Sequence, residues 1–254
     1  MSFKAFLKKE IMEIFKTSKI IVIPSLFLFF GIMSPLSARY TNQILALVGE
    51  QQGIKIILPD PTYIQAYEQL FKNIFFILII AAIMVFAGSI ADEKSKGTAV
   101  LVLTKNLSRT GFILSKLLAA VLLFSVSYAL CIAAFIYYTF LLFHEFANPG
   151  TLMALLSFWV FGIFIISLTF LASILGKSYT AAVVGGFMGY VGFSAIAALP
   201  YIGRYSPGIL QGLSVELARN TKPLGDAVLP FAVALVMAIL AIVLGLAAFK
   251  KQEI

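Results

Sequence analysis

The sequence predicts an all-α polytopic membrane protein with six transmembrane helices and an amphipathic helix at its N-terminus. Two observations lead to this fold class. Of the 254 residues, 61% are hydrophobic and only 12% are charged, and a water-soluble domain of this size could not bury so much apolar surface. The apolar residues also form long continuous runs, which favour helices, whereas the strands of a membrane barrel would alternate apolar and polar residues.

Residues 1–19 are predicted to form an amphipathic helix, the elbow helix, that lies along the membrane interface. Apolar side chains recur at helical spacing on one face, and lysines lie largely on the other faces. A lysine-bearing helix of this kind before a span is typical of an interfacial helix. Its apolar positions are Phe3, Phe6, Leu7, Ile11, Ile14 and Phe15. The alternative is the charged region of a signal peptide, with a cleavage site at Leu36-Ser37-Ala38.

Six apolar runs follow, and residues 20–254 are predicted to form one six-helix transmembrane domain. About 20 residues, at about 1.5 Å per residue, cross the hydrocarbon core of a bilayer. The runs are 20–36, 74–91, 117–143, 152–175, 180–199 and 227–249.

Two connections on the outer side are long. The first, 37–69, is mixed in composition and contains the turn signal Asp60-Pro61. The second, 200–226, contains three prolines and several glycines, a composition that suits short broken helices.

The basic residues are distributed unevenly between the two sides. With the N-terminus inside, thirteen lysines and arginines lie in inner segments and six in outer ones, as the positive-inside rule expects. Six spans return the C-terminus to the same side, so both termini are predicted to be cytoplasmic, in a cell membrane that we expect to be the bacterial plasma membrane. The net charge of +8 therefore reflects topology and anionic lipid, and no nucleic-acid partner is expected.

The sequence offers no group of residues for enzyme catalysis. His144 is the only histidine and Cys131 the only cysteine, so no catalytic residues and no metal site are predicted. The predicted span interiors also lack ionisable side chains, and this disfavours a carrier driven by its own ion gradient.

The fifth run contains the small-x-x-x-small pattern of Gly185 and Gly189. Such a pattern permits close approach of two helices. It predicts either packing within one subunit or a contact in a dimer or transport pathway, and the sequence does not separate these two roles.

The most informative segment is the charged stretch between the second and third runs, Asp92–Lys116, which we call the central loop. It holds five basic residues around the apolar segment 99–103, which is expected to pack on protein. The central loop is predicted to be a docking element for a partner, and an ordinary positive-inside loop is the alternative reading.

The central loop resembles the signature of the ABC-2 family of transporter permeases. In that family an acidic residue after span two is followed by Gly-Thr or Gly-Ser, an apolar stretch, a Pro-x-Ser-Arg-like turn and a lysine that opens span three. The matching residues are Glu93, Gly97-Thr98, 99–103 with Leu101 at the centre, Leu107-Ser108-Arg109 and Lys116. Asn106 departs from the family, which commonly has proline there, and Tyr205-Ser206-Pro207 is similar to a further recurring family feature.

This resemblance implies a permease subunit that lacks a nucleotide-binding domain and binds no cofactor itself. Two permease subunits, identical or different, would assemble with separate ATPase subunits, which would bind ATP and Mg²⁺. The central loop would contact the ATPase through the matching residues named above, flanked by the elbow helix. The expected cargo is amphipathic or hydrophobic, such as a peptide toxin, a bacteriocin or a drug. The alternatives are a stand-alone carrier or channel, and a membrane sensor or scaffold that transports nothing.

Overall fold

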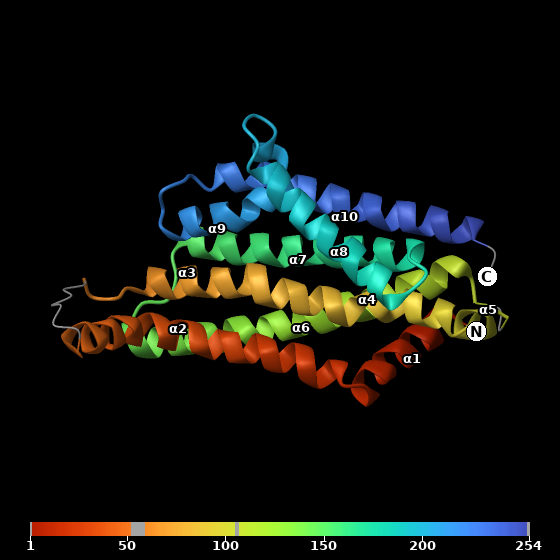
Figure 1. Cartoon of the computed structure of the whole chain (residues 1–254), viewed down its shortest axis with the longest axis horizontal. Coiled ribbons are helices and arrows are strands. Elements are labelled where there is room, and N and C mark those ends of the chain that lie inside the picture. The colour runs from red at the N-terminus through yellow and green to blue at the C-terminus, as the bar shows by residue number, and fades with distance from the viewer. Residues whose placement is uncertain (1, 52–58, 105–106, 253–254) are drawn as a thin grey trace.

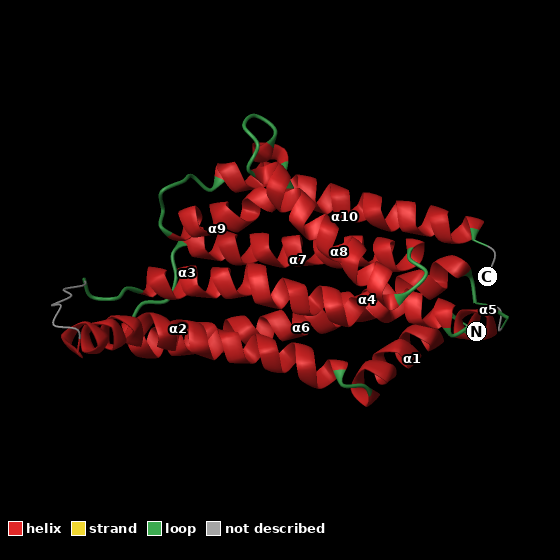
Figure 2. Cartoon of the chain, in the orientation of Figure 1, coloured by secondary structure: helices red, strands yellow, loops and turns green. Residues whose placement is uncertain are grey.

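A computed structural model describes residues 2–51, 59–104 and 107–252, and the regular structure of these residues is entirely helical (Figure 2). In chain order the helices are α1 (Phe3–Lys16), α2 (Lys19–Gln51), α3 (Tyr63–Asn73), the π-helical turn η1 (Ile74–Leu78), α4 (Ile79–Ser95), α5 (Thr98–Leu103), α6 (Arg109–Phe143), α7 (Pro149–Leu175), α8 (Tyr179–Ala197), the 3-10 turns η2 (Gly203–Tyr205) and η3 (Pro207–Ile209), α9 (Leu210–Ala218) and α10 (Gly225–Lys251).

In the described part of the chain, six helices are long and apolar enough to cross a membrane, as predicted: α2, the continuous helix α3–η1–α4, α6, α7, α8 and α10. Most of them run along the long axis of the molecule in one bundle, and α8 crosses it obliquely (Figure 1). A helix satisfies its own backbone hydrogen bonds, and this is what allows these segments to lie in lipid.

The two ends of the bundle differ in what they contain. The N-terminus, α1, α5, the connection between α7 and α8 and the C-terminus all lie at one end, which we call the α5 end (Figure 1). The end of α2, the start of α3 and α9 lie towards the opposite end. Most of the basic residues assigned to the inner side, such as Lys4, Lys94 and Lys250, are therefore gathered at the α5 end.

The long first connection is shorter in the structure than the sequence suggests. The helix α2 continues beyond the predicted run 20–36 as far as Gln51, with Pro24 and Pro35 inside it, and the next helix begins at Tyr63. Helix propagation is favoured once the apolar part of a helix is formed, and membrane helices tolerate proline. The second connection, 200–226, consists of short broken helices, in agreement with the prediction.

The core of the bundle is rich in aromatic side chains. Phe124 of α6 contacts Phe27 of α2 edge-on and Tyr128 in a stacked arrangement, and all three side chains are buried. Gly162 of α7 makes room for this cluster, because a Cβ there would lie 2.1 Å from the ring of Phe124. Between helices surrounded by lipid, close packing supplies the attraction, since apolar burial gains little over lipid contact.

Candidate functional site

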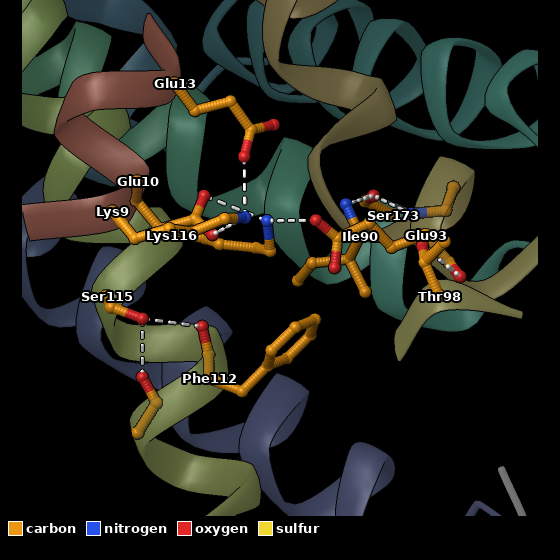
Figure 3. Close-up of polar contacts among 12 residues, drawn as sticks. Lys9, Glu10, Glu13, Ile90, Glu93, Thr98, Phe112, Ser115, Lys116 and Ser173 are labelled. Atoms are coloured by element: carbon orange, nitrogen blue, oxygen red, sulfur yellow. Dashed lines mark hydrogen bonds and ion pairs between the residues drawn. The ribbon is translucent and has the colours of Figure 1, made fainter. Parts of the chain in front are cut away.

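The structure places a buried lysine at the junction of three helices of the α5 end. Lys116 lies near the start of α6, and its side chain is only 4% exposed. Its Nζ donates to Glu10 Oε2 of α1 at 2.9 Å and to Glu93 Oε1 of α4 at 2.6 Å (Figure 3). The rings of Phe6 and Phe112 lie 5.9 and 5.3 Å from the same nitrogen. One ammonium group therefore joins α1, α4 and α6.

A second lysine, Lys9, extends this group of ion pairs along α1. Lys9 Nζ lies 3.0 Å from Glu10 Oε1 and 2.6 Å from Glu13 Oε2. Burying a charge is costly unless it is paired and hydrogen-bonded, and two ammonium groups share three carboxylates here. We call these five residues the ion-pair cluster: Lys9, Glu10, Glu13, Glu93 and Lys116.

The ion-pair cluster shifts the pKa values of two of its α1 residues, Lys9 and Glu13. Partial burial opposes the charged form of Glu13, but the hydrogen bond and the charge of Lys9 outweigh it and lower the pKa of Glu13. By the same balance, Glu13 and Glu10 raise the pKa of Lys9 in spite of its partial burial. Both residues are thus held in their charged forms at neutral pH.

The three carboxylates also form a group that a metal ion could occupy on distance alone. The ligand oxygens of Glu10, Glu13 and Glu93 lie within 4.8 Å of one another. However, the ammonium groups of Lys9 and Lys116 already donate to these oxygens, and their charges would repel a cation. The chemistry of the donor set therefore favours ion pairs over a metal site.

The short helix α5 follows directly after α4, which carries Glu93 of the ion-pair cluster. Gly97 precedes α5 with a left-handed backbone, φ +68°, a conformation that costs other residues energy. The Thr98 hydroxyl donates to the Glu93 carbonyl. Ala99 is buried, whereas Leu101 is 65% exposed. Within the chain only one face of the segment 99–103 packs on the bundle, because a helix this short cannot bury both faces, and Leu101 lies on the other face. Packing of Leu101 on a partner protein stays a prediction.

Both ends of the central loop are attached to the C-termini of long helices. Lys94 Nζ donates to the carbonyl oxygens of Ile174, at 2.6 Å, and Gly176, at 3.2 Å, at the end of α7. An Arg109 guanidinium nitrogen lies 2.8 to 3.2 Å from three carbonyl oxygens at the end of α10, those of Phe249, Lys250 and Gln252. These carbonyls lack helical partners and carry partial negative charge, so cations stabilise them. The base of the central loop is thus connected to α1, α6, α7 and α10.

The residues predicted for ATPase contact therefore separate into two groups. Gly97, Thr98 and Leu101 lie in the exposed part of the central loop, where a partner could reach them. Glu93, Arg109 and Lys116 bind within the chain instead. Their contact with a partner stays a prediction, and any effect they have on a partner passes through the position of α5. Lys105 and Asn106 lie outside the described residues.

The apolar face of the elbow helix is only partly buried. Phe6 is buried in the core, and Leu7 and Ile11 are half-buried. Phe3 and Phe15 remain exposed, at 38% and 67%, as side chains that contact lipid at an interface would be.

Glycines 185 and 189 face another helix of the same chain. A Cβ at Gly185 would lie 2.8 Å from Ala172 Cβ, and one at Gly189 would lie 3.2 Å from a Leu168 methyl group. Of the two roles predicted for the pattern, packing within one subunit against α7 is the one seen in the structure. Their part in a dimer or pathway stays a prediction.

Polar side chains inside the spans mostly bond to neighbouring backbone or to each other. Trp159 Nε1 donates to Ser125 Oγ at 3.0 Å, and Tyr128 donates to the Leu155 carbonyl at 2.7 Å. These bonds connect neighbouring helices and so support the packing of the spans against one another.

Sequence reasoning missed Glu10 and the role of Lys94. A signal for Glu10 was present, because it lies four residues after Phe6 and four before Ile14, in the middle of the apolar face of α1. A carboxylate in that position requires a buried cation. No comparable signal in the sequence links Lys94 to the end of α7, since 80 residues separate it from Ile174.

Fold and site together define a class of protein: a helical membrane protein whose described part has six candidate transmembrane helices, with most of the basic residues assigned to the inner side at one end. The sequence model of the ABC-2 family transporter proteins matches residues 5–201, and the chain belongs to this family. The chain is also 27% identical, over 225 residues, to the uncharacterized transmembrane protein YxlG of Bacillus subtilis (strain 168), covering 86% of this chain and 83% of that protein.

Proposed function

We propose that the chain is the permease subunit of an ATP-driven exporter, and that separate ATPase subunits contact it through α5. The observation that carries this proposal is an exposed leucine on α5, a short helix whose flanking residues bind other helices of the bundle. Leu101 is 65% exposed at the α5 end of the bundle, while the flanks of α5 are connected to four long or buried helices. An exposed apolar side chain at the tip of a polar end suits a protein contact better than contact with water.

The residues of the central loop on either side of α5 support transmission of movement from such a contact. A force on α5 reaches α1 and α6 through Lys116, α7 through Lys94, and α10 through Arg109. A partner shifts a conformational equilibrium only by binding one state more tightly than another. Closure of ATPase subunits on bound ATP and Mg²⁺ would supply that difference in affinity, and the four attached helices would respond together.

The remaining parts of the proposal follow from topology and surface chemistry. The excess of basic residues at the α5 end favours a cytoplasmic position for that end and for both termini. A second permease subunit, identical or related, would complete the assembly and the pathway. The cargo would be an amphipathic or hydrophobic molecule, such as a peptide toxin, bacteriocin or drug. Large apolar side chains exposed along α8, including Phe187 and Met188, are compatible with such a cargo.

The experiment is purification of the tagged chain from its native membrane, followed by measurement of ATP hydrolysis in the purified complex. Leu101→Glu should reduce the co-purified ATPase activity by roughly tenfold or more, as loss of a central contact residue does. Ile202→Glu is the matched control, since Ile202 is 60% exposed in the connection after α8, and it should retain activity. Wild-type protein without ATPase activity, or equal activity in both variants, would contradict the proposal.

A further inference from the structure

A cavity of about 400 Å³ lies beside the ion-pair cluster, enclosed by α1, the start of α2, the end of α4, α5 and α6. We call it the α1 cavity. Its size lies within the range of small-molecule sites, about 300–1,000 Å³. Apolar side chains such as Ile14, Phe86 and Val102 line part of it, and charged side chains line the rest.

The charges lining the α1 cavity are not all used by the protein. Four lysines and four carboxylates border it, and five of these eight residues form the ion-pair cluster. Among the described residues, Lys19, Lys96 and Asp92 make no ion pair. Lys19 and Asp92 are half-buried, so each loses hydration without gaining a salt bridge among the described residues. Two cations and one carboxylate therefore remain available to a ligand.

We propose that the α1 cavity binds the headgroup of an aminophospholipid, with its phosphate at Lys19 and Lys96 and its primary ammonium at Asp92. A phosphate diester matches the two lysines, and charge-assisted hydrogen bonds of this kind are among the stronger ones. An ammonium group with N–H donors satisfies the carboxylate of Asp92, which the quaternary nitrogen of a choline headgroup cannot do. A headgroup without an amine would leave Asp92 unpaired.

The position of the cavity favours a lipid over a soluble zwitterion. It lies where the first span begins, next to the amphipathic helix α1, whose exposed Met12 and Phe15 are suited to lipid contact. The apolar part of its lining can accept the glycerol end of a lipid, and lipid is always present around the spans. The inference goes beyond the proposed function and does not depend on ATPase binding.

The test uses the full chain in detergent, with phosphatidylethanolamine, phosphatidylcholine and phosphatidylglycerol of identical acyl chains added in turn. Native mass spectrometry counts the lipids that remain bound. Wild-type protein should retain phosphatidylethanolamine roughly tenfold better than phosphatidylcholine, the effect of about one hydrogen bond to a charged group. Asp92→Asn should abolish this preference and keep binding of phosphatidylglycerol.

A second cavity variant, Lys96→Gln, keeps the proposal testable if Asp92→Asn does not fold. Lys96 is exposed, so Lys96→Gln should fold normally, and it should weaken retention of both phosphatidylethanolamine and phosphatidylglycerol. Lys177→Gln, an exposed lysine of the same end that does not line the cavity, should change nothing. Equal retention of the ethanolamine and choline lipids by wild-type protein would overturn the proposal, as would an ethanolamine preference that persists in Asp92→Asn. Displacement of the lipid by an equal concentration of soluble phosphoethanolamine would overturn the lipid as the ligand.

Discussion

Replacing Lys116 by methionine tests how strongly the ion-pair cluster holds the elbow helix. The change removes the ammonium group between Glu10 and Glu93 and leaves two carboxylates whose side chains are 8% and 18% exposed. Breaking a buried ion pair from one side costs about 3–5 kcal/mol. Glu10 keeps its pair with Lys9, 3.0 Å away, and Glu93 has some access to water. The lower end of that range, about 3 kcal/mol, is therefore the expected loss.

The loss should appear as local opening of α1, which hydrogen exchange detects. About 3 kcal/mol corresponds to roughly a hundredfold change in the opening equilibrium, so the amides of α1 should exchange about a hundredfold faster in Lys116→Met. Exchange in Lys177→Met, an exposed lysine at the same end, should match wild-type. Protection should return in large part when Glu10→Gln and Glu93→Gln are added, because the uncompensated charges are then gone. If the amides of α1 in Lys116→Met exchanged within about threefold of the wild-type rate, Lys116 would not hold α1 in the way described.

Three further predictions concern single positions. Gly97→Ala should cost about 1 kcal/mol at its left-handed backbone and speed hydrogen exchange in α5, while the melting temperature of the bundle stays unchanged; a lowered melting temperature would contradict a purely local effect. Gly162→Ala should destabilise the bundle by about 1–3 kcal/mol, because its Cβ would lie 2.1 Å from the buried ring of Phe124; in thermal unfolding Gly192→Ala, with no described atom within 4 Å of its Cβ, is the neutral control. Since the folded-state pKa of Glu13 is lowered, its contribution to stability is present above the ordinary carboxyl pKa and is lost as pH falls through the lowered value. The difference in melting temperature between wild-type and Glu13→Gln should therefore be seen at pH 7 and vanish in acid, and a difference that grows in acid would exclude this assignment.

The transmembrane helices could be predicted from the sequence because each depends on a local property, a long apolar run. Five of the six predicted runs lie wholly within the observed helices, and the remaining one, the fifth run 180–199, extends two residues past the end of α8 at Ala197. The sequence did not predict the extension of α2 to Gln51, because the last turns of this helix are more polar than its apolar part. Their composition therefore resembles that of a loop. Packing and propagation from the apolar part decide such cases.

The candidate site was predictable in its location but not in its connections. The charges of the central loop marked the segment, and the pattern Glu93 to Lys116 marked the family. What the sequence could not show is that Lys116 is directed into the bundle towards Glu10, 106 residues earlier, or that Arg109 binds the end of α10. These contacts depend on the tertiary arrangement of helices, which periodicity along one helix does not contain.

The proposed contact between ATPase subunits and α5 can be measured by cross-linking in the assembled complex. A cysteine at position 101, in a background where the buried Cys131 is replaced by alanine, would carry a short bifunctional reagent. We expect a covalent product with the ATPase subunit from position 101 and none from a cysteine at position 202, in the connection after α8. A product from position 202 alone, or from neither position in a complex that hydrolyses ATP, would contradict the proposed contact.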